Sequence, residues 1–351
     1  MKRALAPLAA VLALLAPGAA SPCGGFFGSE VEVDPDQEIV VVYRGGNETY
    51  LFSPRFCGTA SAFGVILPIP APLGEAPSLA DPAIFEELDR YTEPTRVEVC
   101  ASSGGIGCGA AGAGGPGGPG FGTGVDVVDQ GRVGIFEYSV VQAATADAFT
   151  NWLTTNGYPY DPGAAYVYDA YVGNGWYFVA FRVSADAGGL EPGQRLCGDL
   201  GPIRLSFPSA SPFVPARISG VNTHAGPLPT WRVFLVASEQ QRVTLGSGFD
   251  PTLYFSGTLA HGTMSDFPSL TGLSLDGERL TAIDVRFPYG GAPGDIAFEV
   301  EAVPADHRSV IRVSKDCGGC EAGGTPTLLA GLLAALGVLR AAGRGARRRR
   351  S

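Results

Sequence analysis

WYFVAFRV, from Trp176 to Val183, is a strong strand signal in this chain of 351 residues. Aromatic and β-branched residues fill six of its eight positions, and it contains neither glycine nor proline, which is the composition that strands favour. Other apolar runs surround it at the spacing of a sandwich fold. The other predicted strands are Glu38–Tyr43, Thr49–Phe56, Ala62–Leu67, Thr95–Cys100, Val125–Val128, Val133–Val141, Ile203–Phe207, Ala216–Ser219, Trp231–Ala237, Arg242–Leu245, Thr252–Phe255, Leu280–Phe287, Ile296–Ala302 and Ser309–Val313.

Three short helices are predicted between these strands, each from a capping signal. Asp81 and Pro82 open the first, which ends before Pro94. Thr145 caps the second, which ends at Gly157, and the third runs from Asp161 to Gly173. The predicted fold class is therefore a β-rich α+β domain with antiparallel, sandwich-like sheets and about three short helices.

The N-terminus has the pattern of a secretory signal peptide. Lys2 and Arg3 are basic, Leu5–Leu15 is apolar, and Gly18–Ala20 supplies small residues for cleavage. We therefore expect residues 1–20 to be a signal peptide and residues 21–316 to form the exported domain, either as one large domain or as two intimate ones.

The C-terminus, residues 317–351, predicts an anchor. It contains the apolar run Leu328–Leu339 and ends in a cluster of arginines. A transmembrane helix over about 325–346 would be roughly 33 Å long, enough to cross a hydrocarbon core of about 30 Å. The terminal arginines then lie on the cytoplasmic side. The alternative is a buried core helix followed by a basic tail.

The tail combines CGGC at residues 317–320 with this short apolar helix and the terminal arginines. Together they resemble the myxobacterial-type C-terminal sorting tag. The resemblance implies a sorting protease in the membrane, cleavage, and display at the cell surface or outer membrane, with Cys317 or Cys320 as the processing and lipidation site. Without processing, the protein would stay at the periplasmic face of the inner membrane. Gly323 and Gly324 also suit the related Gly-Gly tag.

Cysteine use favours disulfides over metal binding, because the domain is expected to be exported. Cys100 and Cys108 flank a glycine turn and are predicted to pair. Cys57 and Cys197 each precede a strand-like run and form a second candidate pair, which leaves Cys23 over. The sequence alone leaves the connectivity open. Ser102–Gly124 consists mainly of glycine, alanine and proline and is predicted to be a disordered loop.

The exported domain is strongly acidic. The whole chain has 24 basic and 34 acidic residues. Without the eight basic residues and the one acidic residue of the two ends, a net charge near −17 remains. Such a domain repels nucleic acid and anionic lipid headgroups, so no nucleic-acid partner is expected.

No catalytic, metal-binding or cofactor-binding residue is predicted, and no cofactor is expected. The three histidines, His224, His261 and His307, lack any paired metal spacing. Asp34, Asp36 and Glu38 alternate, and they suit either a calcium site or a solvated turn between strands. Seven aromatic residues cluster in the chain and suit either a ligand groove or a packed core; they are Tyr158, Tyr160, Tyr166, Tyr168, Tyr171, Trp176 and Tyr177.

Six segments of the exported domain match a family pattern in order. They are CGGFF at 23–27, FGVILPIP at 63–70, VGIFE at 133–137, NGY at 156–158, GWYFVAFRV at 175–183, and PIRLSF with PARIS between 202 and 219. They resemble a family of exported bacterial proteins known as domain of unknown function 2330. The resemblance implies a shared fold and export, and it implies no particular activity.

The sequence therefore predicts an exported, surface-anchored protein that acts as a non-catalytic binding or structural module of the envelope. Its anchor contacts the membrane through the C-terminal helix, and its protein or glycan partner is open. The alternative is an exported enzyme, either a hydrolase or a thiol-dependent enzyme, whose site is assembled from distant loops.

Overall fold

The structure is a computed structural model that describes about three fifths of the chain. The described residues are 25–27, 31–33, 36–59, 63–100, 124–158, 160, 165–184, 195–199, 201–222, 230–238, 241–244, 249–260, 267–273, 275, 277–286, 294–300 and 305–315. They belong to two compact units, one within residues 1–95 and 108–311 and the other within residues 96–107 and 312–351. The predicted signal peptide, Gly-rich loop up to residue 123 and membrane helix lie outside the described residues.

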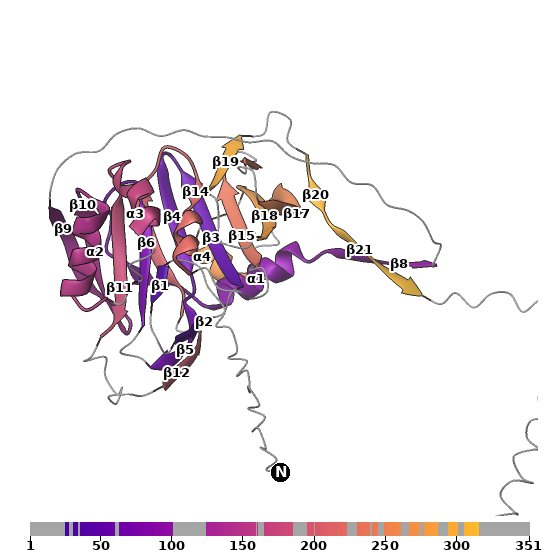
Figure 1. The fold of residues 1–351 in the computed structure, drawn as a ribbon. Coiled ribbons are helices and arrows are strands. Elements are labelled where there is room, and N and C mark those ends of the chain that lie inside the picture. Colours follow the sequence, from indigo (N-terminus) through magenta and orange to yellow (C-terminus); the bar gives the residue numbers. More distant parts are fainter. Residues whose placement is uncertain are drawn as a thin grey trace, which may run out of the picture. The chain divides into compact units, whose positions relative to one another are not determined.

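The first unit contains a five-stranded antiparallel sheet (Figure 1). Its centre is β11, the strand of the WYFVAFRV run, which pairs with β6 on one side and β10 on the other. The strand order is β1 (Gly25–Phe27), β6 (Gly64–Ile69), β11 (Tyr177–Val183), β10 (Phe136–Ala143) and β9 (Val125–Val133).

An eight-stranded sheet is the second large element of this unit. Its centre joins β15 to β3 as parallel neighbours, while the other strand pairs that the structure describes in it are antiparallel. The order is β20 (His307–Arg308), β17 (Asp250–Thr258), β18 (Arg279–Arg286), β15 (Thr230–Ala237), β3 (Gln37–Arg44), β4 (Asn47–Phe52), β13 (Ile203–Pro208) and β7 (Ser78–Leu79).

Smaller elements complete both units. Two three-stranded sheets have the orders β12 (Arg195–Asp199), β5 (Arg55–Thr59), β2 (Val31–Val33) and β14 (Phe213–Val214), β19 (Ile296–Val300), β16 (Gln241–Thr244). The helices are α1 (Ala83–Thr92), α2 (Ala146–Thr155), α3 (Ala165–Val172), α4 (Pro268–Gly272) and the 3-10 helix η3 (Arg217–Asn222). A separate two-stranded sheet pairs β8 (Thr95–Cys100) with β21 (Val310–Lys315).

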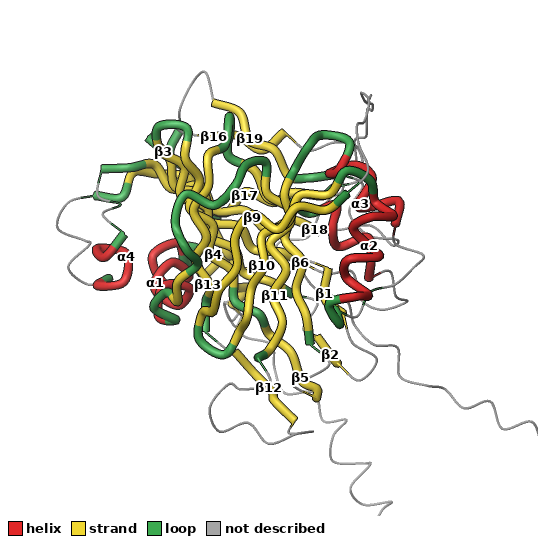
Figure 2. Tube along the Cα trace, turned by 90° about the vertical axis from the view of Figure 1, so that its left-hand side faces the viewer, coloured by secondary structure: helices red, strands yellow, loops and turns green. Residues whose placement is uncertain are grey.

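Successive side chains of a strand point to opposite faces of its sheet, and each large sheet buries both of its faces. Odd-numbered residues of β3 and β11, such as Val41 and Phe181, belong to a core between the two sheets, whereas Val40 and Phe178 belong to two other cores. One of these lies under α2 and α3, and the other under α1 and α4. Figure 2 shows these helices on opposite flanks of the strands. The first unit therefore has four layers: helices, sheet, sheet, helices.

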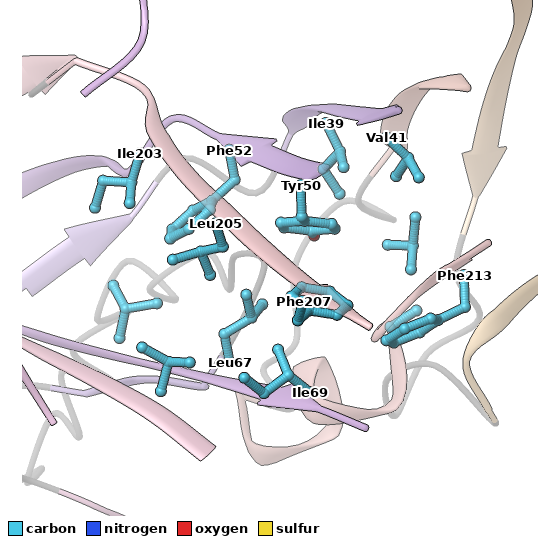
Figure 3. Packing of buried hydrophobic residues seen from close by; sticks show 14 of the residues in the cluster. Ile39, Val41, Tyr50, Phe52, Leu67, Ile69, Ile203, Leu205, Phe207 and Phe213 are labelled. Atoms are coloured by element: carbon cyan, nitrogen blue, oxygen red, sulfur yellow. The ribbon is translucent and has the colours of Figure 1, made fainter. Parts of the chain in front are cut away.

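The central core is apolar and rich in aromatic residues. Figure 3 shows Leu67 and Ile69 of β6 facing Tyr50, Leu205 and Phe207 of the eight-stranded sheet. Phe207 is 1% exposed, and its ring centroid lies 6.0 Å from that of Phe213. Burial of apolar surface between two sheets is the main contribution to their association.

The capping signals predicted from the sequence are present. The Asp81 carboxylate accepts a hydrogen bond from the Ala83 N–H at 3.0 Å at the start of α1. Thr145 Oγ1 accepts one from the Ala148 N–H at 3.0 Å at the start of α2, and Gly157 follows that helix at φ +71°. The start of the third predicted helix, at Asp161, lies outside the described residues.

Three parts of the predicted secondary structure differ clearly from the structure. Thr49–Phe56 is two strands, because β4 ends at Phe52 and β5 begins at Arg55 after Ser53 and Pro54. Ala216–Ser219 is not a strand, since η3 begins at Arg217. The hairpin between β9 and β10 turns at Gly134 (φ +55°) and not around Gly131.

Gly131 lies inside β9, opposite Tyr138. A Cβ atom at Gly131 would stand 2.8 Å from the Tyr138 ring. The close approach of this ring, rather than a turn, therefore requires glycine at this position.

The described helices do not provide a membrane span. None of them is both long enough and apolar enough to cross a bilayer. The segment predicted to do so, about 325–346, is outside the described part of the chain.

Candidate functional site

Charged side chains form a row across the outer face of the eight-stranded sheet, beneath α1. Arg232 of β15 stands opposite Glu38 of β3 on one side and opposite Asp284 of β18 on the other. Arg55 of β5 continues the row beyond Glu38, and Asp89 of α1 covers it. We call these five residues the charged row.

Arg232 ties the helix to the sheet. Its Nε and Nη2 donate to the two carboxylate oxygens of Asp284 at 2.9 and 3.1 Å, and Nη1 donates to Asp89 Oδ1 at 2.9 Å. The guanidinium also lies 4.8 Å from the centroid of the Tyr254 ring. A bidentate carboxylate contact and a cation–π contact both favour arginine over lysine here.

Glu38 and Asp89 are two neighbouring carboxyl groups. Burial raises the pKa of Glu38, and so does the charge of Asp89, while Arg55 and Arg232 oppose the shift. The carboxyl groups of Glu38, Asp89 and Asp284 therefore share two guanidinium groups, those of Arg55 and Arg232.

Two neighbouring carboxyl groups, one of them with a raised pKa, are an arrangement that some hydrolases use for acid–base catalysis. In this protein each group is also bound by an arginine, Glu38 by Arg55 at 2.6 Å and Asp89 by Arg232 at 2.9 Å. These contacts fix both carboxyl groups in place. The arrangement is suited to holding α1 against the sheet through the ion pair between Asp89 and Arg232.

Replacing Arg232 with methionine is expected to lower the free energy of unfolding by about 2 kcal/mol at neutral pH. The variant leaves Asp89 and Asp284 without this cation, next to Glu38. Urea titration of the full chain measures the loss. Arg132→Met is the control, because Arg132 is 55% exposed where it pairs with Glu137, and exposed pairs contribute less than about 1 kcal/mol. Equal losses in the two variants would show that the charged row is no stronger than a surface pair.

A second polar cluster lies between α3 and η3. Tyr171 donates a hydrogen bond to Asp295 Oδ1 at 2.6 Å and accepts one from the Ile218 N–H at 3.1 Å. Asp295 Oδ1 also accepts from the Arg217 N–H at 3.0 Å. Burial raises the pKa of both Tyr171 and Asp295. The cluster satisfies the buried N–H groups at the start of η3 and fixes that segment to α3.

Glu48 is a fully buried carboxyl group at the start of β4. Its Oε2 accepts a hydrogen bond from the Phe213 N–H at 3.1 Å, while Oε1 has no hydrogen-bond partner among the described residues. Burial raises the pKa of Glu48 well above its ordinary value. The folded protein therefore holds a proton here at a pH where the unfolded chain releases it.

This proton predicts a pH dependence of stability. The stabilisation from the proton is complete below the unfolded pKa, near 4.5, and is lost as the pH rises through the higher folded pKa. Relative to a Glu48→Gln variant, the wild type should therefore become progressively less stable above about pH 4.5. Urea titrations at several pH values measure this difference. Glu75→Gln, at a side chain that is 58% exposed, is the control and should follow the wild type. A constant difference for Glu48→Gln would contradict the prediction.

The cysteines predicted to pair across a sheet do so. Cys57 of β5 and Cys197 of β12 stand directly opposite each other and form a disulfide. Cys108 lies outside the described residues, so the Cys100–Cys108 pair stays a prediction. Cys23 and the predicted processing residues Cys317 and Cys320 also lie outside the described residues.

The residues left open by the sequence are now placed in part. Asp36 accepts a hydrogen bond from the Thr230 N–H at 2.9 Å, and Glu38 belongs to the charged row; Asp34 is outside the described residues. Of the histidines, His307 is exposed on β20, while His224 and His261 lie outside. The described residues contain no group of three or more His, Cys, Asp or Glu side chains that could hold a metal ion.

The clustered aromatic residues mainly form core. Tyr158, Tyr168 and Tyr171 are at most 4% exposed and pack with Phe149 of α2 and Phe178 of β11 in one core. Tyr166 is the exception, at 63% exposed. The packed-core interpretation is therefore right for the buried members of the set.

Sequence reasoning missed Arg232, Asp284 and Glu48. Arg232 and Asp284 are charged residues within largely apolar strands, TWRVFLVA and RLTAIDVR, whereas Glu48 lies at the start of β4, NETYLF. A charge at the position of an inward-facing residue signals a buried or half-buried pair. The sequence therefore contained a signal for charged pairs in these strands. It could not identify the partners, because these depend on the order of the strands in the sheet.

Comparisons with known proteins give one family and one solved structure. The model of a family described as "Uncharacterized protein conserved in bacteria (DUF2330)" matches residues 17–299. No curated protein matches. A solved structure titled "Crystal structure of baculovirus P35" is similar at a TM-score of 0.33 and 10% identity, over 82% of this chain and 100% of that chain. At that TM-score the likeness supports no argument. Because the family model covers most of the chain, this protein belongs to the DUF2330 family of uncharacterized conserved bacterial proteins.

Proposed function

We propose that this protein is exported, anchored in a membrane by its C-terminal segment, and displayed on the cell surface as a non-catalytic module of the envelope. Export would remove residues 1–20, and the anchor would be processed at Cys317 or Cys320. The module would act by binding a protein or glycan of the envelope or by contributing to envelope structure.

The Cys57–Cys197 disulfide is the observation that carries the proposal. Disulfides persist in exported proteins and are rare in the cytoplasm of mesophilic bacteria, where thiols are kept reduced. This bond joins residues separated by 140 positions, so it constrains a large part of the domain. A disulfide of this kind is typical of proteins in an oxidising compartment and supports export.

The charge distribution supports the same location. The proposed exported domain, residues 21–316, is strongly acidic, whereas both ends of the chain carry basic residues, Lys2 and Arg3 at one and the arginine cluster at the other. A basic end beside an apolar segment favours retention of that end on the cytoplasmic side. The acidic domain would then lie on the other side of the membrane.

Thiol accessibility in intact cells tests export. In the full chain, Cys57 and Cys197 should resist a maleimide reagent until a reductant is added. The control lacks residues 2–20, should remain in the cytoplasm, and should be labelled at both positions without reductant. Full labelling of the intact chain without reductant would overturn the export proposal.

Fractionation tests the anchor separately. The full chain should be found with membranes or on the surface, and a chain that ends at residue 316 should be released in soluble form. Mass spectrometry of the surface fraction should find no arginine-rich C-terminus, since processing removes it. An intact C-terminus on surface material would contradict processing, and membrane retention of the shortened chain would contradict anchoring by the tail.

A further inference from the structure

The two-stranded sheet of β8 and β21 exposes apolar side chains. Val97 of β8 is 41% exposed, and Val310, Ile311 and Val313 of β21 are between 44% and 53% exposed. Residues 95–98 and 310–313, the part of this sheet whose side chains the structure describes, are all exposed. A sheet of two strands is marginally stable alone, and three or more strands are needed to stabilise it.

The open edge of such a sheet is a template for another strand. The described residues give β8 one neighbour in the sheet, β21. The sequence of β8 is TRVEVC. Val97 stands at its middle, with a cation before it at Arg96 and an anion after it at Glu98.

This order of charges is complementary to itself. When two copies of β8 pair in antiparallel orientation about Val97, Arg96 of each copy stands opposite Glu98 of the other. Val97 then meets its own counterpart on the two-fold axis. Both charge pairs are favourable. Because both chains use the same surface in this two-fold contact, it forms a dimer and does not recruit further copies.

We propose that the edge of β8 is a dimerisation surface, at which a second copy of this chain adds its own β8 to make a four-stranded sheet. The strand order across the dimer is β21-β8-β8-β21. Arg96 and Glu98 already have partners within the chain, and dimerisation adds one opposite charge to each. The inference does not depend on the cellular location of the protein.

Charge reversal tests the register. Light scattering of the purified full chain should give the mass of a dimer for the wild type. Glu98→Arg alone places Arg96 opposite arginine twice, and Arg96→Glu alone places Glu98 opposite glutamate twice. Each should raise the dimer dissociation constant by at least about tenfold. The double variant R96E/E98R restores opposite charges and should restore the dimer.

Every outcome of this experiment decides the question. A monomeric wild type overturns the proposal, and so does a dimer that neither single reversal weakens. Loss of the dimer in the double variant, with circular dichroism unchanged, also contradicts the register. A dimer held by the C-terminal segment instead would be insensitive to all three variants.

Cross-linking provides an independent check. Opposed side chains on an antiparallel pair have Cβ atoms about 4.5–5.5 Å apart, close enough for a disulfide after small shifts. Val97→Cys should therefore give a covalent dimer on a non-reducing gel after mild oxidation. Val313→Cys, a similarly exposed valine on β21, is the control and should not exceed the wild-type background. Equal cross-linking at the two positions would contradict a β8 axis.

Discussion

Replacing Phe181 with alanine is expected to lower the free energy of unfolding by about 3–5 kcal/mol. Phe181 is fully buried at the centre of β11. Its ring lies 6.1 Å from that of Phe52 in the opposite sheet, and 6.4 and 6.3 Å from those of Phe136 and Tyr138 in its own. The substitution therefore leaves a cavity between the two sheets, which neither sheet can fill alone.

Urea titration of the full chain measures this loss, with two comparison variants. Tyr166→Ala removes an aromatic side chain that is 63% exposed and should change stability by less than about 0.5 kcal/mol. Phe181→Leu keeps most of the buried volume and should cost far less than alanine. A loss below about 1 kcal/mol for Phe181→Ala would mean that the two sheets do not share a packed core.

Removing the disulfide is expected to have an effect of similar size. The Cys57→Ser/Cys197→Ser variant should lose about 3–5 kcal/mol, because the bond closes a long loop and limits the unfolded chain. The separation of 140 residues places it at the upper end of that range. The midpoint of urea unfolding, measured under oxidising conditions, reports the loss.

A reductant supplies the matched control. Reduced wild type should be destabilised to about the level of the variant, whereas the variant itself should not respond to reductant. If reductant left the wild type unchanged while the variant was destabilised, the effect would come from the substituted side chains and not from the bond.

Much of the fold could be predicted because local chemistry determined it. Trp176–Val183 reads as a strand in any context, and the caps at Asp81 and Thr145 depend on neighbouring residues alone. The error at Ala216–Ser219 has a tertiary cause. Asp295, far along the chain, accepts from the Arg217 N–H and thereby stabilises a 3-10 turn where the side chains alone favour a strand.

The charged row could not be predicted in the same way. Glu38, Arg232 and Asp284 meet only because β15 lies between β3 and β18, and strand order is not a local property. The sequence instead grouped Glu38 with Asp34 and Asp36, its neighbours in the chain. Residues that are close in sequence were considered together, whereas Glu38 forms an ion pair with Arg55 and stands opposite Arg232.

The parallel pairing of β3 with β15 affects how the protein is made. Asp36 and Thr230, which hydrogen-bond at the start of these strands, are separated by 194 residues. Contacts of such long range form slowly, because a large loop must close first. During synthesis, β3 and β4 emerge long before β15. The centre of the eight-stranded sheet therefore cannot form until the second half of the chain has been synthesised. Assembly of the first unit is thus a late event that follows translation of most of the polypeptide.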